Sequence, residues 1–160
     1  MKLVTVVLAL AWILGGCAEL IPGKSREADV VASFGVPAET RQLADGGRVL
    51  EYPREPLGNQ NWRVTLNADG TVRSVEQLVD EAHFARLRAG MSVDEVQREL
   101  GRPSEKSGFP NLGEEVSSWA YLELDRRWYF NAHFDAGTGK LKRTSHTPDP
   151  AWPATPDTTM

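Results

Sequence analysis

The feature that most constrains this chain is an internal repeat with a separation of 66 residues. The motif Phe34-Gly35-Val36-Pro37 recurs as Leu100-Gly101-Arg102-Pro103, and Val30 corresponds to Val96 at the same offset. Further along, residues 62–72 and residues 130–141 share a pattern: an alternating strand, a turn that contains glycine, and a second strand. Two copies are too few for a solenoid, so the repeat predicts a duplicated domain.

The second copy carries the clearer helix signals. Ser92 and Glu95 have the spacing of a capping box, in which each side chain bonds a free backbone N–H at the helix start. Gly101 suits the residue that closes a helix, and Pro103 prevents its continuation. We therefore predict a helix over residues 92–100, with three apolar residues on its inner face: Val93, Val96 and Leu100.

The remaining periodicities predict an α+β fold with two modules, αβββ over residues 24–78 and ααβββ over residues 79–146. Each module is expected to place its helices on one face of an antiparallel sheet. The loop from 102 to 113 is rich in proline and glycine, and residues 147–160 read as a Pro-rich disordered tail. The helices are expected at 25–34, 80–88 and 92–100, and the strands at 48–52, 61–66, 71–78, 116–124, 127–134 and 140–145.

The N-terminus has the pattern of a lipoprotein signal. A positive start at Lys2 precedes an apolar run over residues 3–14, which is short for a membrane span. The sequence Leu14-Gly15-Gly16-Cys17 then resembles the bacterial lipobox. This resemblance implies a signal peptide over 1–16, lipidation of Cys17, a tether over 17–23 and a periplasm-facing position on the outer membrane. The alternative is an ordinary secretory peptide.

Residues 80–146 resemble the SmpA/OmlA (BamE-like) family of small outer-membrane lipoproteins. The resemblance rests on Phe84, on Gly90-Met91-Ser92 and on the helix that ends in Leu100-Gly101-Arg102-Pro103, followed by strands. It implies an accessory or scaffold role in outer-membrane protein assembly or envelope integrity, through a periplasmic or outer-membrane protein partner. The tandem arrangement is also similar to the β-lactamase inhibitor proteins, which implies the alternative of a periplasmic inhibitor or ligand-binding module.

Patterns that would indicate catalysis do not occur. The three histidines, His83, His133 and His146, have no second ligand at zinc spacing, and no Gly-x-Ser-x-Gly elbow or phosphate-binding loop occurs. The net charge of −4 gives no reason to expect nucleic-acid binding. We therefore expect no enzyme activity, no cofactor and no metal, with His83 at the surface.

The strands of the second module predict a binding face. In residues 127–134 the even positions are apolar, and we expect the even positions of 116–124 to join them in the core. The opposite face would then hold five candidate partner-binding residues: Trp119, Tyr121, Arg127, Tyr129 and His133. Trp, Tyr and Arg are enriched at binding hot spots. Two alternatives stay open: other parts of the chain cover the rings, or a bulge exchanges the two faces.

Overall fold

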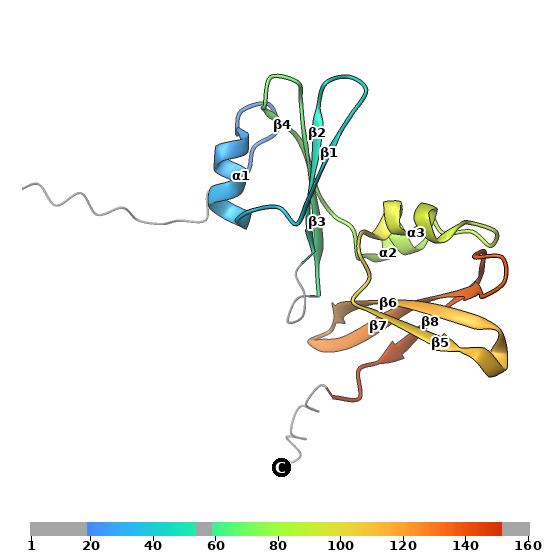
Figure 1. Ribbon diagram of the computed structural model, residues 1–160. Helices are drawn as coiled ribbons and strands as arrows, with labels where there is room; N and C mark the ends of the chain where they lie inside the picture. Colours follow the sequence, from blue (N-terminus) through green and yellow to red (C-terminus); the bar gives the residue numbers. More distant parts are fainter. Residues whose placement is uncertain (1–18, 54–58, 152–160) are drawn as a thin grey trace, which may run out of the picture.

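The computed structural model describes residues 19–53 and 59–151. It has an α+β fold with two antiparallel four-stranded sheets, in the order β1-β2-β3-β4 and β5-β6-β7-β8 (Figure 1). The first half holds α1 (Glu27–Phe34), β1 (Glu39–Gln42), β2 (Arg48–Pro53), β3 (Asn61–Leu66) and β4 (Val72–Gln77). The second half holds α2 (Glu81–Phe84), α3 (Val93–Leu100), β5 (Glu105–Phe109), a 3₁₀ turn η1 (Pro110–Leu112), β6 (Glu114–Glu123), β7 (Arg126–Asp135) and β8 (Leu141–Pro148).

The two halves repeat the same sequence of elements. The first residues of α3, β5 and β6 each follow those of α1, β1 and β2 by 66 residues, as the repeat predicts. The start of the helix also pairs with the sheet in the same way in both halves. Arg26 forms an isolated antiparallel β-bridge with Thr71, and Ser92 forms one with Lys140. In both halves this bridge joins the residue before the helix to the turn that precedes the last strand.

Helix α3 follows the sequence prediction closely. The Ser92 hydroxyl accepts from the Glu95 N–H at 3.3 Å, and the Glu95 carboxylate accepts from the Ser92 N–H at 2.7 Å. These reciprocal bonds satisfy two donors that a helix start leaves free. Val96 and Leu100 are fully buried, and Val93 packs against the same cluster, so the predicted inner face is confirmed.

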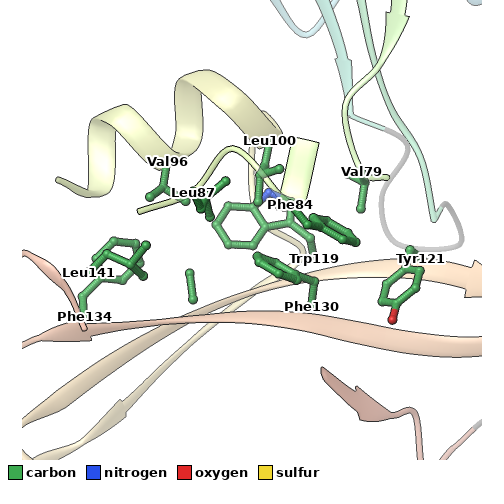
Figure 2. Packing of buried hydrophobic residues seen from close by; sticks show 11 residues of the cluster. Val79, Phe84, Leu87, Val96, Leu100, Trp119, Tyr121, Phe130, Phe134 and Leu141 are labelled. Carbon is green, nitrogen blue, oxygen red and sulfur yellow. The ribbon is translucent and has the colours of Figure 1, made fainter. Parts of the chain in front are cut away.

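The core of the second half is largely aromatic and lies between its helices and its sheet (Figure 2). Phe84 stacks on Phe130 with ring centroids 4.0 Å apart, and Trp119 donates from its indole nitrogen to the Gly101 carbonyl oxygen at 3.1 Å. The core of the first half is smaller and mainly aliphatic. Its buried members are Val30, Leu50, Tyr52, Val64, Leu66 and Val72.

Each sheet has one strand more than the three that the sequence predicts. The additional strands β1 and β5 are the first in their sheets, and every residue in both is exposed. Such edge strands need no apolar face, so they leave no alternating pattern in the sequence. Strand β5 and η1 lie within residues 102–113, which the glycine and proline content had marked as a loop.

The predicted face of β6 is wrong. Trp119 lies opposite Phe130 and Tyr121 lies opposite Trp128, so the odd positions of β6 share a face with the even positions of β7. Trp119 is therefore 1% exposed and Tyr121 is 7% exposed, whereas Leu122, an even position of β6, is 47% exposed. Alternation within one strand does not specify which parity of the next strand lies opposite it; only the register does.

Three further expectations bear on the same half. Strand β8 extends to Pro148, so residues 147 and 148 belong to the sheet and not to the tail. His83 is buried rather than at the surface, and its Nδ1 lies 2.7 Å from the Asp80 carboxylate that caps α2. Cys17 and the signal sequence lie outside the described residues, as does most of the proposed tail.

Candidate functional site

The face of the second sheet opposite α2 and α3 is the first candidate site. Four residues of β7 point to this outer face: Arg127, Tyr129, Asn131 and His133. Both helices lie on the other side of the sheet, as Figure 1 shows. Of the five predicted partner-binding residues, the structure brings three together here, Arg127, Tyr129 and His133, and places the other two, Trp119 and Tyr121, in the core.

Tyr121 has a structural environment that a surface residue would lack. Its hydroxyl is 2.7 Å from Nδ1 of His146, and its ring packs edge-on against Phe84 at 5.3 Å. Burial, together with the negative charge of Glu123, raises the pKa of Tyr121 to about 12. The phenol therefore stays protonated at neutral pH and can donate its hydrogen to His146.

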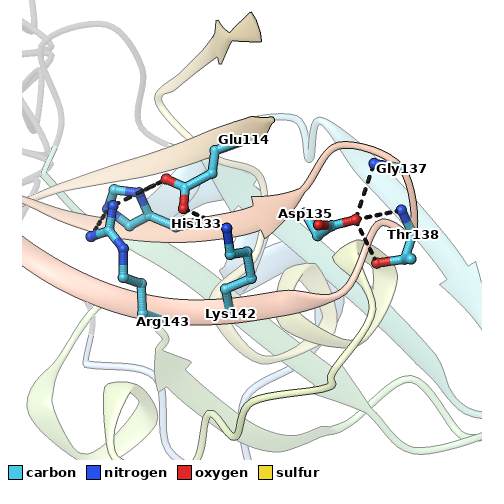
Figure 3. A network of polar contacts seen from close by, with 7 residues as sticks. All are labelled: Glu114, His133, Asp135, Gly137, Thr138, Lys142 and Arg143. Atoms are coloured by element: carbon cyan, nitrogen blue, oxygen red, sulfur yellow. Dashed lines mark hydrogen bonds and ion pairs between the residues drawn. The ribbon is translucent and has the colours of Figure 1, made fainter. Parts of the chain in front are cut away.

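Glu114 organises one end of the outer face (Figure 3). This buried carboxylate contacts Lys142 Nζ at 2.9 Å, Arg143 Nη2 at 3.0 Å and His133 Nδ1 at 3.2 Å. The hydrogen bond from Lys142 is the largest cause that lowers the pKa of Glu114 to about 2, followed by the bond from His133 and the charge of Arg143. Glu114 is thus a buried anion compensated from two neighbouring strands, β7 and β8.

In the same network a serine, a histidine and a carboxylate are linked one to the next by polar contacts. Nε2 of His133 lies 2.9 Å from the Ser145 hydroxyl, while its Nδ1 faces Glu114. Hydrolases use this order of groups, but Nε2 must be free to take the serine proton. Here Arg143 Nη1 lies 3.2 Å from Nε2, and arginine can only donate. We interpret the cluster as a structural network that orients the side chains of the face.

The other end of the outer face is formed by Arg127 and Tyr129. The Arg127 guanidinium lies 5.6 Å from the centre of the Tyr129 ring, a cation–π arrangement. The Tyr129 hydroxyl donates to Glu105 at 3.1 Å, and Arg127 Nε lies 3.5 Å from the Asp149 carboxylate. Burial, followed by the bond to Glu105, raises the pKa of Tyr129. An aromatic ring, a cation and hydrogen-bonding groups are therefore held together on a rigid sheet.

A groove between the two halves is the second candidate site, with a volume of about 960 Å³. The first half contributes the edge strand β1 and Glu51, and the second half contributes α3, the segment after it and the start of β5. Asn61 joins the two walls, because its amide donates to the Leu100 and Arg102 carbonyls at 2.8 Å each. The lining is mostly charged: Glu39, Arg41, Glu51, Asp94, Arg98, Arg102, Glu105 and Lys106.

Sequence reasoning missed Glu114 and the groove for different reasons. Glu114 lies two residues before the predicted strand 116–124. Its partners Lys142 and Arg143 lie more than twenty residues after Glu114 in the chain. Residues that far apart carry no local signal of their contact. The groove depends on β1 and β5, whose polar sequences predict no strand.

Within residues 19–53 and 59–151, no group of three or more His, Cys, Asp and Glu side chains is placed to hold a metal ion. In that same part of the chain, no helix is long and apolar enough to cross a membrane.

No protein-family model matches the chain, and no curated protein matches its sequence. Among solved structures, the chain is similar to a DUF4309 family protein, YjgB, from Bacillus subtilis, with 14% identity over 82% of this chain and 84% of that chain and a TM-score of 0.33. It is also similar to a candidate beta-lactamase inhibitor protein from Streptococcus mutans, with 14% identity over 77% and 82% and a TM-score of 0.31.

A third similar structure is an extracellular protein from Bacillus anthracis that contains an SCP domain. The identity is 13% over 86% of this chain and 51% of that chain, with a TM-score of 0.31. Because these similarities are distant, we argue the function of this chain from its own residues.

Proposed function

We propose that this protein is a non-catalytic, lipid-anchored binding protein that faces the periplasm and captures a protein partner with the outer face of its second sheet. The observation that carries the proposal is the outer face itself, along which Arg127, Tyr129 and His133 all lie on the side of β7 opposite the helices. Tyrosine and arginine are the residue types that most often supply binding energy at interfaces. The face of an open sheet suits a protein surface better than a small ligand, which needs a deeper pocket.

The membrane anchor in this proposal rests on the lipobox-like sequence at Cys17. A diacylglyceryl group and an N-acyl chain on one residue would hold the protein stably, because each buried CH₂ contributes about 0.8 kcal/mol. The expected tether over residues 17–23 is in part docked on the first half, because Leu20 packs against its core and the Gly23 N–H donates to the Val72 carbonyl at 2.8 Å. About three residues, or roughly 10 Å when extended, would then separate Cys17 from the fold. The binding face would therefore work close to the membrane surface.

Two kinds of partner fit this arrangement. A periplasmic enzyme, inhibited by capture on the sheet, is favoured by the duplication, since both halves repeat one order of helix and strands. A subunit of the outer-membrane assembly machinery is the second candidate, favoured by the lipobox-like sequence and by the SmpA/OmlA-like motif around α3. We rank the inhibitor or ligand-binding role first, because the duplication extends over both sheets.

Site-specific photocrosslinking in the native envelope tests the proposal. A benzoylphenylalanine at Tyr129 should crosslink to one defined protein, identified by mass spectrometry of the adduct. A single periplasmic hydrolase would support the inhibitor role, and barrel-assembly subunits would support the accessory role. The same probe at Lys24, which is exposed on the first half, is the matched control.

A second variant separates binding from folding. Tyr129→Ala should weaken partner capture by about 2 kcal/mol if Tyr129 is a hot spot, while the melting temperature changes little because this ring lies outside the core clusters. The proposal fails if Tyr129 gives no adduct beyond the Lys24 control, or if Tyr129→Ala leaves capture unchanged.

A further inference from the structure

Strand β5 is an open edge of the second sheet. It pairs with β6 on one side, and all five of its residues are exposed. An edge strand has backbone N–H and C=O groups that can pair with another strand, and proteins usually protect such edges with lysine, proline, bulges or covering elements. Strand β5 carries one such residue, Lys106, whose charge repels a basic strand but attracts an acidic one. In β5 the residues Ser107 and Gly108 are small, and a Cβ added at Gly108 would meet no atom within 4 Å.

Two hollows follow this strand one after the other. The groove between the halves is lined by Glu105 and Lys106 at the start of β5. A smaller hollow of about 280 Å³ is lined by Lys106, Ser107 and Gly108, and it reaches Val93 of α3 and Phe134 of the core. Because Lys106 lines both hollows, they form a continuous space along β5 that could receive the side chains of another strand.

The groove offers more free positive than negative groups. Four cations line it, and none forms an ion pair with a residue in the described part of the chain: Arg41, Arg98, Arg102 and Lys106. Of the four carboxylates, Glu51 is already paired with Arg63 at 2.8 Å. One net positive charge therefore remains in a chain whose net charge is −4, which favours an acidic occupant.

We propose that β5 is the docking site for an extended, acidic segment of another polypeptide, which adds to the second sheet as a further strand. Its backbone pairs with β5, and its acidic side chains lie beside Arg102, Lys106 and Arg41. Alternate side chains of the added strand point to opposite sides. Strand addition draws affinity from the backbone and specificity from the pockets that receive these side chains. The site is the edge of the sheet, so the inference does not depend on the outer face.

The test uses the full-length protein in detergent micelles and a capped peptide of alternating threonine and glutamate. Threonine favours an extended backbone, and glutamate supplies the charge. Two probes of the same length separate the parts of the proposal. A threonine–lysine peptide reverses the charge, and an N-methylated threonine–glutamate peptide keeps the charge but lacks backbone donors. Calorimetry measures affinity, and amide chemical shifts locate the bound peptide.

The expected result is binding of the acidic peptide with shifts concentrated in β5, and weak binding of both other peptides. The double variant Arg102→Glu and Lys106→Glu should weaken the acidic peptide about tenfold or more, which corresponds to about 1.4 kcal/mol. Lys24→Glu reverses one charge at an exposed residue that does not line the groove, and it should have little effect on peptide binding.

Three results would overturn the proposal. Equal binding of the N-methylated peptide would exclude strand pairing, and equal or tighter binding of the lysine peptide would exclude the assigned charge. Shifts confined to residues outside β5 and the rest of the groove lining, or a loss with Lys24→Glu as large as with the double variant, would exclude the site. Crosslinking at Tyr129 is independent of all three, so this inference and the proposed function can fail separately.

Discussion

The two halves of the molecule share an order of elements but build different cores. In the first sheet Leu50 lies opposite Val64, so residues of equal parity share a face. In the second sheet Trp119 lies opposite Phe130, so residues of opposite parity do. The repeat would place Phe130 opposite Val116, the equivalent of Leu50, but His133 lies there, and this odd shift of three residues changes which side chains reach the core. The shift occurs although α3, β5 and β6 keep the 66-residue offset from α1, β1 and β2.

The halves also differ in how their sheets use charge. Arg48 begins β2 and pairs with Glu27 of α1. At the equivalent place in β6 stands Glu114, which pairs with Lys142 and Arg143 of β8. At this position the ion pair joins the sheet to its helix in the first half and joins two strands in the second. The first sheet has its own cross-strand pair elsewhere, between Arg63 and Glu51. The repeat preserves the backbone arrangement, while the side chains have taken different partners.

The largest expected effect is at Trp119, and it tests the register of the second sheet. Trp119→Ala removes a buried ring and its hydrogen bond to the Gly101 carbonyl. Truncation of a buried aromatic residue typically costs about 3–5 kcal/mol, a large share of the roughly 5–15 kcal/mol that stabilises a typical domain. Thermal unfolding followed by circular dichroism should show a strong decrease in melting temperature. Leu124→Ala, at a side chain 96% exposed, is the control; similar melting temperatures for both variants would mean that Trp119 lies outside the core.

The next prediction asks whether the two cores unfold separately. Leu50→Ala and Leu100→Ala each truncate a fully buried leucine, one in each core. Each should cost about 2–5 kcal/mol. Because the two clusters share no member, Leu50→Ala should accelerate amide hydrogen exchange mainly in β2–β4, and Leu100→Ala mainly in β6–β8. Equal acceleration in both sheets would indicate one cooperative unit, and Arg98→Ala should change neither.

A smaller difference is expected at the two equivalent glycines that close α1 and α3. Gly35 and Gly101 have φ of 84° and 72° with ψ of −160° and −164°, a region that is almost restricted to glycine, so alanine is strained at either position. A Cβ at Gly35 meets nothing within 4 Å, whereas at Gly101 it would lie 3.0 Å from the Asn61 amide and 3.3 Å from Leu78. Gly35→Ala should cost about 1–3 kcal/mol, and Gly101→Ala clearly more. Chemical denaturation measures both, and equal losses would place Asn61 farther from α3.

The smallest effect concerns Glu114, whose contribution to stability is present at neutral pH and is lost in acid. The pKa of Glu114 is about 2 in the folded chain and 4.5 as its ordinary value. A carboxylate with a depressed pKa stabilises the fold above its unfolded pKa, and this contribution is lost as the pH falls from about 4.5 toward 2. Glu114→Gln should therefore destabilise the protein at pH 7 and flatten its stability curve below pH 4.5. Lys24→Gln, at an exposed lysine that forms no ion pair with another described residue, should leave the acid limb unchanged; an unchanged acid limb in Glu114→Gln would contradict the network.

Local rules predicted the parts of the fold that local interactions decide. The capping box at Ser92, the glycine that closes α3 and the apolar stripe of α3 depend on residues within a few positions of one another. The strands β2, β3, β6 and β7 were found because each has a buried face and so an apolar pattern. Strands β1 and β5 lie exposed at the edges and have no such pattern.

The candidate sites were only partly predictable, because they depend on contacts between strands. Arg127, Tyr129 and His133 were placed correctly on one face, since alternation within a single strand orders them. Trp119 and Tyr121 were assigned to that face through an assumed register with β7. The sequence by itself thus determined the duplication, the helix ends and the alternation within each strand. Only the tertiary structure decided the register of β6 against β7, the partners of Glu114 and the groove beside β5, because backbone pairing between strands is nearly the same in any register and the packed core selects one.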